Sequence, residues 1–154
     1  MRSSDAVLKA EAVDYAAALI AYPPERAALD AGGALDLLVD VVRQRGTDFR
    51  YRTISVEGPD DLMCLYARDG QPDCIVGEVL HEAGVDIPTL ESFRDEGIRE
   101  LWFEQRLPIC LTFGAVLVLH RAQASQDRGD CWGVALASAE QLLAELASLL
   151  PWRC

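Results

Sequence analysis

Hydrophobic residues recur every three or four positions along most of this chain, and this spacing predicts helices. Glycines mark several expected helix ends, as at Gly46, Gly84 and Gly129. Proline is favoured at the first position of a helix, so we expect Pro108 to begin the helix that ends near Arg128. The predicted helices cover residues 5–22, 33–45, 73–83, 89–96, 98–105, 108–128 and 130–149.

The pattern changes to alternation in one region, where residues 49–56 read FRYRTISV and residues 62–67 read LMCLYA. Side chains that alternate in character are typical of strands, and the turn-forming stretch EGPDD separates the two runs. We therefore expect one antiparallel β-hairpin at about 49–56 and 62–67. The predicted fold class is α+β, a mostly helical single domain that spans residues 1–154.

The charge of the chain disfavours direct binding to nucleic acids. The formal net charge is −11, so the basic stripe that neutralises phosphates is missing. Thirteen arginines against one lysine indicate a GC-rich genome rather than phosphate recognition. Imitation of DNA is a minor alternative, because the acidic residues are spread along the chain and interleaved with the arginines.

The sequence predicts neither a secretion signal nor a membrane span. Lys9, Glu11 and Asp14 interrupt the apolar stretch that a signal peptide needs. The longest apolar run, residues 107–119, includes Pro108 and is shorter than the roughly 20 residues that cross a bilayer. Five cysteines, an odd number without the spacing of a disulfide framework, fit a reducing compartment. We therefore expect a cytoplasmic protein that makes no contact with membranes.

The stretch CLYARDGQPDCIVGEVLHEAG, which begins at Cys64, is the first candidate site. At 100° per residue the apolar side chains of its predicted helix share one arc, whereas Cys74, Glu78 and His81 fall on the opposite, polar arc. A thiol at a helix N-terminus is favoured as a thiolate, so Cys74 is a candidate nucleophile. The alternative is a crowded corner in which Cys64, an Asp-Gly turn and Gly77 pack closely and Cys74 fills space.

Catalysis by Cys74 requires a base, and the two histidines are the candidates. His81 lies seven residues further along the same predicted helix, about 10 Å away, which is too far for direct proton transfer. The fold would have to bring His120 to the thiol. If the protein is an enzyme, Cys74 and His120 are therefore its candidate catalytic pair. The sequence instead favours the crowded corner, in which Cys74 has no catalytic role.

The cysteines and histidines also define the ligands available for a metal. For a zinc ion they are Cys64, Cys74 and His81, with a fourth ligand from His120, Cys110 or Cys131. Tetrahedral zinc sites use paired ligands at short spacing, such as Cys-x-x-Cys, and the chain has no such pair. We therefore expect no metal and no cofactor.

A second candidate site lies near the end of the predicted helix 108–128, where His120, Gln123 and Asp127 share one face. Polar residues that continue an apolar stripe indicate a partly buried hydrogen-bond network, which would tie this helix end to Trp132. The functional alternative is a ligand pocket in which Gln123 and Asp127 bind and Trp132 stacks. The structural role is favoured, because amide and indole N–H groups near helix junctions are commonly structural.

Two motifs carry a family resemblance. They read CxYxxDGxPxCIVGxVL, from Cys64 to Leu80, and AQxxQDxGxxWxxAL, from Ala122 to Leu136. Together they resemble a family of small, uncharacterised proteins of actinobacteria and their phages, over roughly residues 34–145. The resemblance implies an accessory protein of phage or prophage origin in a GC-rich host, and it implies no activity.

The segment PDCIVGEVLHEAGVDIPTLESFRDEG also resembles the region around the nucleophile of NlpC/P60-type cysteine peptidases, where Asp-Cys begins a helix that ends in Ala-Gly. This resemblance implies that Cys74 is the nucleophile and that His120 is the nearest match to the base. The chain departs from the family at Ile75, where the family has serine, and after His120, where helix is predicted instead of strands. The peptidase is therefore the weaker expectation.

The expected function is binding to an unidentified host or phage protein rather than catalysis. This expectation rests on the acidic charge, the incomplete catalytic set and the first resemblance. The alternatives are a hydrolase or transferase that depends on Cys74, and a small-ligand sensor with a pocket near Trp132. A homo-oligomer is a further expectation, because residues 109–119 are apolar on every side, although a buried central helix explains that pattern equally well.

Overall fold

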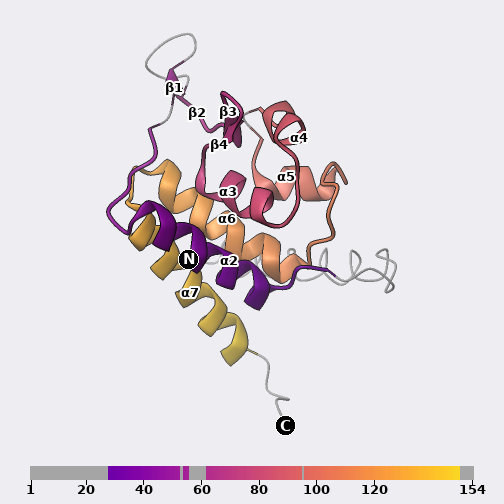
Figure 1. Cartoon of the computed structure of the whole chain (residues 1–154). Coiled ribbons are helices and arrows are strands. Elements are labelled where there is room, and N and C mark those ends of the chain that lie inside the picture. Colours follow the sequence, from indigo (N-terminus) through magenta and orange to yellow (C-terminus); the bar gives the residue numbers. More distant parts are fainter. Residues whose placement is uncertain (1–27, 53, 56–61, 95, 150–154) are drawn as a thin grey trace.

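The computed structural model describes residues 28–52, 54–55, 62–94 and 96–149. The predicted helix at residues 5–22 and the loop of the predicted hairpin lie outside the described residues. Within the described ranges, helices pack around a central helix, and two short β-hairpins lie together on one side (Figure 1). The predicted α+β, mostly helical fold class is confirmed.

The helices of the described region match the expected ones in number and order. They are α2 (Ala31–Arg45), α3 (Ile75–Glu82), α4 (Ile87–Ser92), α5 (Ile98–Phe103), α6 (Phe113–Asp127) and α7 (Trp132–Ser148). Asp30 caps α2 by accepting a hydrogen bond from the Gly33 N–H at 2.7 Å. Gly46, with a φ of 102°, follows the last residue of α2, as predicted.

The described strands form two antiparallel pairs. They are β1 (Ile54–Ser55), β2 (Leu62–Met63), β3 (Ala67–Arg68) and β4 (Gln71–Pro72). The pair β1–β2 is the predicted hairpin, with Ile54 opposite Met63. The pair β3–β4 is a second hairpin across Asp69 and Gly70, whose φ angles are 55° and 77°. Two turn residues with positive φ favour a tight hairpin, so the expected turn at Asp69 connects two strands.

Helix α6 is the centre of the described fold and packs against α2, α3, α5 and α7 (Figure 1). Val116, Val118 and Leu119 are all 0% exposed, although they point in different directions around the helix axis. A buried central helix therefore explains the apolar run that also suggested a homo-oligomer. None of the described helices combines the length and the apolar composition that crossing a bilayer demands.

The prediction that Pro108 begins this helix is wrong. Helix α6 begins at Phe113, and its N-cap Thr112 accepts a hydrogen bond from the Ala115 N–H at 3.2 Å. The preceding residues pair with Leu29, which donates to the Cys110 carbonyl at 2.9 Å and accepts from the Thr112 N–H at 3.0 Å. Backbone pairing with a distant segment therefore overrides the preference of proline for a helix start.

Candidate functional site

Helix α3 is covered along most of its polar arc, as the favoured crowded-corner interpretation predicts. Cys74 is 0% exposed and Glu78 is 8% exposed, so the accessible thiol that the enzyme alternative requires is absent. Gly77 shows the reason, because a Cβ at this position would lie 1.9 Å from the carbonyl oxygen of Tyr66. The backbone that leads into the second hairpin thus lies directly on the helix. His81 is exposed as expected.

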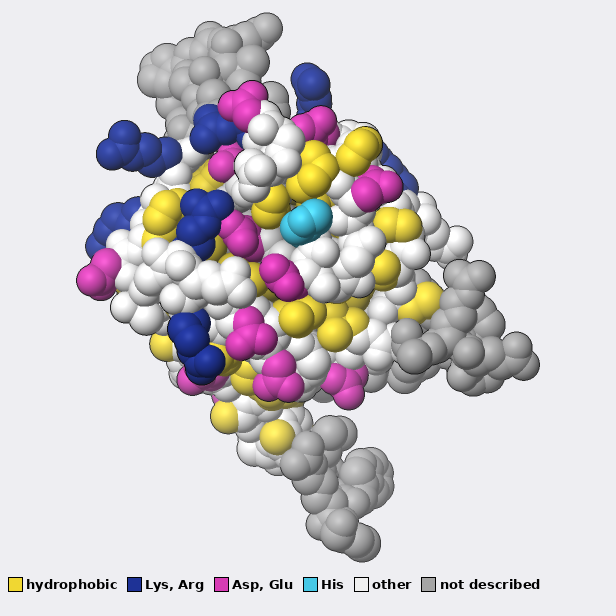
Figure 2. Space-filling view, in the orientation of Figure 1, with side chains coloured by type: hydrophobic (Ala, Val, Ile, Leu, Met, Phe, Trp, Pro, Cys, Tyr) yellow, Lys and Arg dark blue, Asp and Glu magenta, His cyan; other side chains and the backbone are white. Residues whose placement is uncertain are grey.

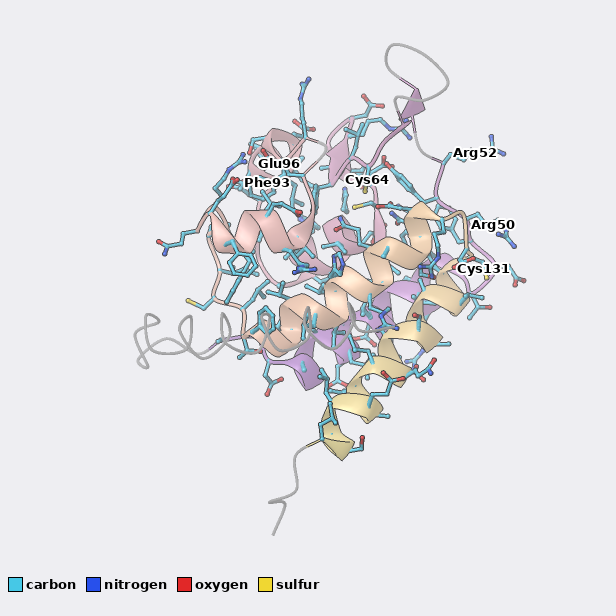
Figure 3. All side chains as sticks on the ribbon, turned by 180° about the vertical axis from the view of Figure 1, so that it is seen from behind. Arg50, Arg52, Cys64, Phe93, Glu96 and Cys131 are labelled. Atoms are coloured by element: carbon cyan, nitrogen blue, oxygen red, sulfur yellow. The ribbon has the colours of Figure 1, made fainter. Side chains whose placement is uncertain are left out.

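Cys74 and Cys64 are neighbours at the start of α3. Cys74 is the N-cap residue, and its sulfur accepts a hydrogen bond from the Gly77 N–H at 3.3 Å. Cys64 is half-buried and lies over α6 (Figure 3). The hydrogen bond with the Cys74 thiol, followed by burial, raises the pKa of the Cys64 thiol above its ordinary range. Both residues are free thiols.

The buried side chain of Gln126, on α6, joins the two cysteine segments. Its Oε1 accepts a hydrogen bond from the Ile75 N–H at 2.7 Å, and its Nε2 lies 3.7 Å from Cys64 Sγ and 3.1 Å from Asp127 Oδ1. A buried amide bonded at both ends fixes the start of α3 against α6. Helical spacing in the sequence did not single out Gln126, although it stands one helical turn after Gln123.

Gln123 makes the second buried amide link. Its Oε1 accepts a hydrogen bond from the Ile98 N–H at 3.1 Å, and its Nε2 donates to the Tyr66 hydroxyl at 3.0 Å. The Tyr66 hydroxyl in turn donates to the Glu96 carbonyl at 2.6 Å. Burial raises the pKa of Tyr66, so its hydroxyl stays protonated at neutral pH. The predicted network exists, but at Gln123 it ties α6 to α5 and to Tyr66 rather than to Trp132.

Tyr51 holds the first hairpin against the same corner. Its hydroxyl donates to Asp73 Oδ2 at 2.9 Å and accepts a hydrogen bond from the Leu65 N–H at 3.0 Å. Asp73 also faces Arg68, whose Nη2 is 3.6 Å from Asp73 Oδ1. Burial is the main cause that raises the pKa of Tyr51. The polar groups around Cys74 are therefore engaged in holding several elements together.

Trp132 packs in a different place from Gln123. It is 0% exposed, and the edge of its ring meets Phe49 at a centroid distance of 4.7 Å. The Arg45 guanidinium lies 5.8 Å from the centre of the Trp132 ring and also pairs with Glu78. The indole N–H of Trp132 has no acceptor among the described residues. Trp132 thus belongs to a packed junction of α2, α3 and α7.

The remaining predicted residues are dispersed. The Nδ1 atom of His81 lies 3.1 Å from the carbonyl oxygen of Val85, His120 is half-buried on α6, and Asp127 is exposed at the end of that helix. In the described ranges no three His, Cys, Asp or Glu side chains converge as metal ligands. Of the candidate metal ligands, the structure brings together Cys64 and Cys74.

The arrangement limits the chemistry of Cys74. A nucleophile must touch its substrate, and this sulfur is completely covered, with the Gly77 backbone against Tyr66 on one side.

Comparison with protein-family models, with curated proteins and with solved structures found no match. The function of this corner therefore has to be inferred from its own geometry, which is that of a closed structural junction containing a pair of thiols.

Proposed function

We propose that this chain is an acidic accessory protein that acts by binding another protein through the second half of α7, and not by catalysis. The partner is a host or phage protein, and the origin in a phage or prophage follows from the resemblance carried by the two motifs. We further propose that it works in the cytoplasm, where its cysteines stay reduced, without binding nucleic acid or membranes directly.

The observation that carries this proposal is the apolar stripe of α7, formed by Ala135, Ala139, Leu142, Leu146 and Leu149. Ala135 and Ala139 are 0% exposed, whereas Leu142 and Leu146 are half-buried and Leu149 is 73% exposed. The stripe therefore begins inside the fold and continues along the part of α7 that extends beyond the other described helices (Figure 1). Figure 2 shows hydrophobic side chains on this projecting part.

A helix with one apolar face binds proteins by laying that face into an apolar groove. The charges of α7 indicate what surrounds the groove, because the helix carries Glu140 and Glu145 but no lysine or arginine. The whole chain has a formal net charge of −11. A partner whose groove is rimmed by lysine or arginine complements both the stripe and the charge.

Burial of Cys74 supports binding over catalysis. A hydrolase or transferase would need the corner between α3 and the second hairpin to open, which separates Gly77 from Tyr66 and breaks the bond between Gln126 and Ile75. A small-ligand sensor at Trp132 would need space beside a side chain that is 0% exposed. The stripe of α7 needs no such rearrangement to reach a partner.

The first test uses the purified partner, recovered as a stoichiometric complex from the lysate of an actinobacterial host. Leu146→Asp places a charge in the middle of the stripe, so we expect the Kd of the complex to rise by about 100-fold. Val134→Asp is the matched control, because Val134 is 49% exposed on the same helix but lies off the stripe. We expect the control to change Kd by less than about threefold. Isothermal titration calorimetry measures both.

Two results would contradict the proposal. If Leu146→Asp lowers the melting temperature of the isolated monomer by much more than Val134→Asp does, the stripe is covered by this chain itself. If sedimentation velocity shows a dimer that Leu146→Asp dissociates, the stripe binds a second copy. Binding that does not weaken between about 50 mM and about 500 mM salt would exclude the basic rim.

A further inference from the structure

Cys64 and Cys74 lie on neighbouring stretches of backbone. The Cys74 N–H donates to the Leu65 carbonyl at 3.1 Å, and the Asp73 N–H donates to the Tyr66 carbonyl at 3.0 Å. These bonds extend the register of β3 and β4, in which Cys74 stands opposite Leu65 and Cys64 is the next residue along the neighbouring stretch. A spacing of about 5 Å between the stretches and a rise of about 3.3 Å per residue put diagonal neighbours roughly 6 Å apart, and the Cα atoms of disulfide-bonded cysteines are about 4.4–6.8 Å apart. The backbone separation therefore suits a disulfide.

The side chains of the two cysteines are also held in place. Cys74 Sγ is bonded to the Gly77 N–H, and the Gln126 amide contacts Cys64 Sγ at one end and the Ile75 N–H at the other. The Cys74 thiol is close enough to raise the pKa of the Cys64 thiol. These contacts hold the two thiols near each other at the start of α3.

We propose that Cys64 and Cys74 form a reversible disulfide and so make a two-electron redox site in the corner between α3 and the second hairpin. The oxidant is a low-molecular-weight disulfide such as oxidised glutathione. The Cys64 sulfur attacks it, forming a mixed disulfide and releasing one thiol. The Cys74 sulfur then attacks the Cys64 sulfur and releases the second thiol. The protein loses two protons and two electrons, and the oxidant becomes two thiols.

Exposure fixes the order of these two steps. Cys64 is half-buried, whereas Cys74 is 0% exposed, so an external oxidant meets Cys64 first. The raised pKa of the Cys64 thiol leaves little thiolate at pH 7. The first step is therefore slow at neutral pH, and its rate rises with pH as more thiolate forms. A reducing cytoplasm keeps the pair as dithiols.

The test treats the folded wild-type chain with oxidised glutathione, alkylates the remaining thiols, and maps the peptides by mass spectrometry. We expect a linked peptide pair containing Cys64 and Cys74, two hydrogens lighter than the dithiol form, which dithiothreitol restores. The disulfide should raise the melting temperature by roughly 5–10 °C, because it restricts the conformations of the unfolded chain. Cys110 and Cys131 are half-buried free thiols and serve as internal controls.

Cys74→Ser separates the two steps, since serine is itself a favoured N-cap residue. We expect this variant to stop at a stable mixed disulfide between Cys64 and glutathione, while Cys110→Ser oxidises like the wild type. Linkage of Cys64 or Cys74 to any other cysteine, or a wild-type chain whose Cys110 is modified while Cys64 and Cys74 stay reduced, would overturn the proposal. The wild-type map decides the question even if a variant fails to fold.

Discussion

At the scale of single residues, Gly77 decides how α3 sits in the molecule. A Cβ at this position would lie 1.9 Å from the carbonyl oxygen of Tyr66 and within 2.9 Å of two further backbone atoms of that residue. Backbone atoms cannot rotate away as the end of a side chain can. The backbone of Tyr66 can therefore lie against α3 beside Cys74 only because residue 77 has no side chain.

Gly77→Ala tests this contact. The added methyl group forces the helix and the hairpin apart, so we expect the free energy of unfolding to fall by at least about 3 kcal/mol. Gly32→Ala is the matched control, because Gly32 is also helical and a Cβ there meets only Asp30 Oδ1, at 3.6 Å. The control should gain about 0.5 kcal/mol from its better helix propensity. Urea denaturation measures both, and equal effects would refute the close contact.

The polar arc of the predicted α3 helix shows what residue patterns miss. The spacing of Cys74, Glu78 and His81 correctly separated them from the apolar arc, yet the structure buries the first two and exposes the third. Helical periodicity records which side chains share a face, and it contains no information on which distant segment covers that face. The crowded corner was the correct alternative, and its covering segment is the backbone at Tyr66.

At the scale of elements, the ion pair between Arg45 and Glu78 joins the end of α2 to the middle of α3. The Glu78 side chain is 10% exposed, and the Arg45 guanidinium also lies over the rings of Phe49 and Trp132. A carboxylate buried to this extent lowers the free energy of unfolding unless a cation is paired with it. Arg45 therefore connects three helices through one charge.

Arg45→Met keeps most of the apolar stem and removes the charge. We expect it to lower the free energy of unfolding by about 2 kcal/mol, less than a fully buried pair would lose, because the Arg45 side chain is 37% exposed. Arg43→Met, at an exposed position of the same helix, should change stability by less than about 0.5 kcal/mol. Thermal unfolding followed by circular dichroism compares the two. A loss as large in the control would show that the effect comes from helix propensity.

At the scale of the whole molecule, α6 links two distant aromatic clusters. Trp102 meets Phe113 at the start of α6 and donates its indole N–H to the Leu111 carbonyl at 3.0 Å. Trp132 meets Phe49 beyond the other end of α6. If the described helices form one cooperative unit, the two clusters must unfold together.

The indole resonances of Trp102 and Trp132 report on the two clusters separately in ¹⁵N-labelled protein. We expect both native signals to disappear with the same midpoint in urea, within about 0.2 M, because α6 packs against α2, α3, α5 and α7. Trp102→Phe provides the assignment and serves as the control. A lower midpoint for one tryptophan would show that the predicted single domain consists of two units.

The sequence by itself determined most elements of the described region: the helices apart from the start of α6, the first hairpin, the helix end at Gly46 and the apolar stripe of α7. It did not predict the second hairpin. Local spacing and turn residues carry this information, because each helix must present one apolar face and each turn needs particular backbone angles. The tertiary structure alone decided that Leu29 holds the residues before α6 extended, that Gln126 bonds to Ile75, and that Cys74 is covered beside Cys64. These contacts join residues far apart along the chain, and only the packing of α6 against its neighbours determines which buried polar groups meet.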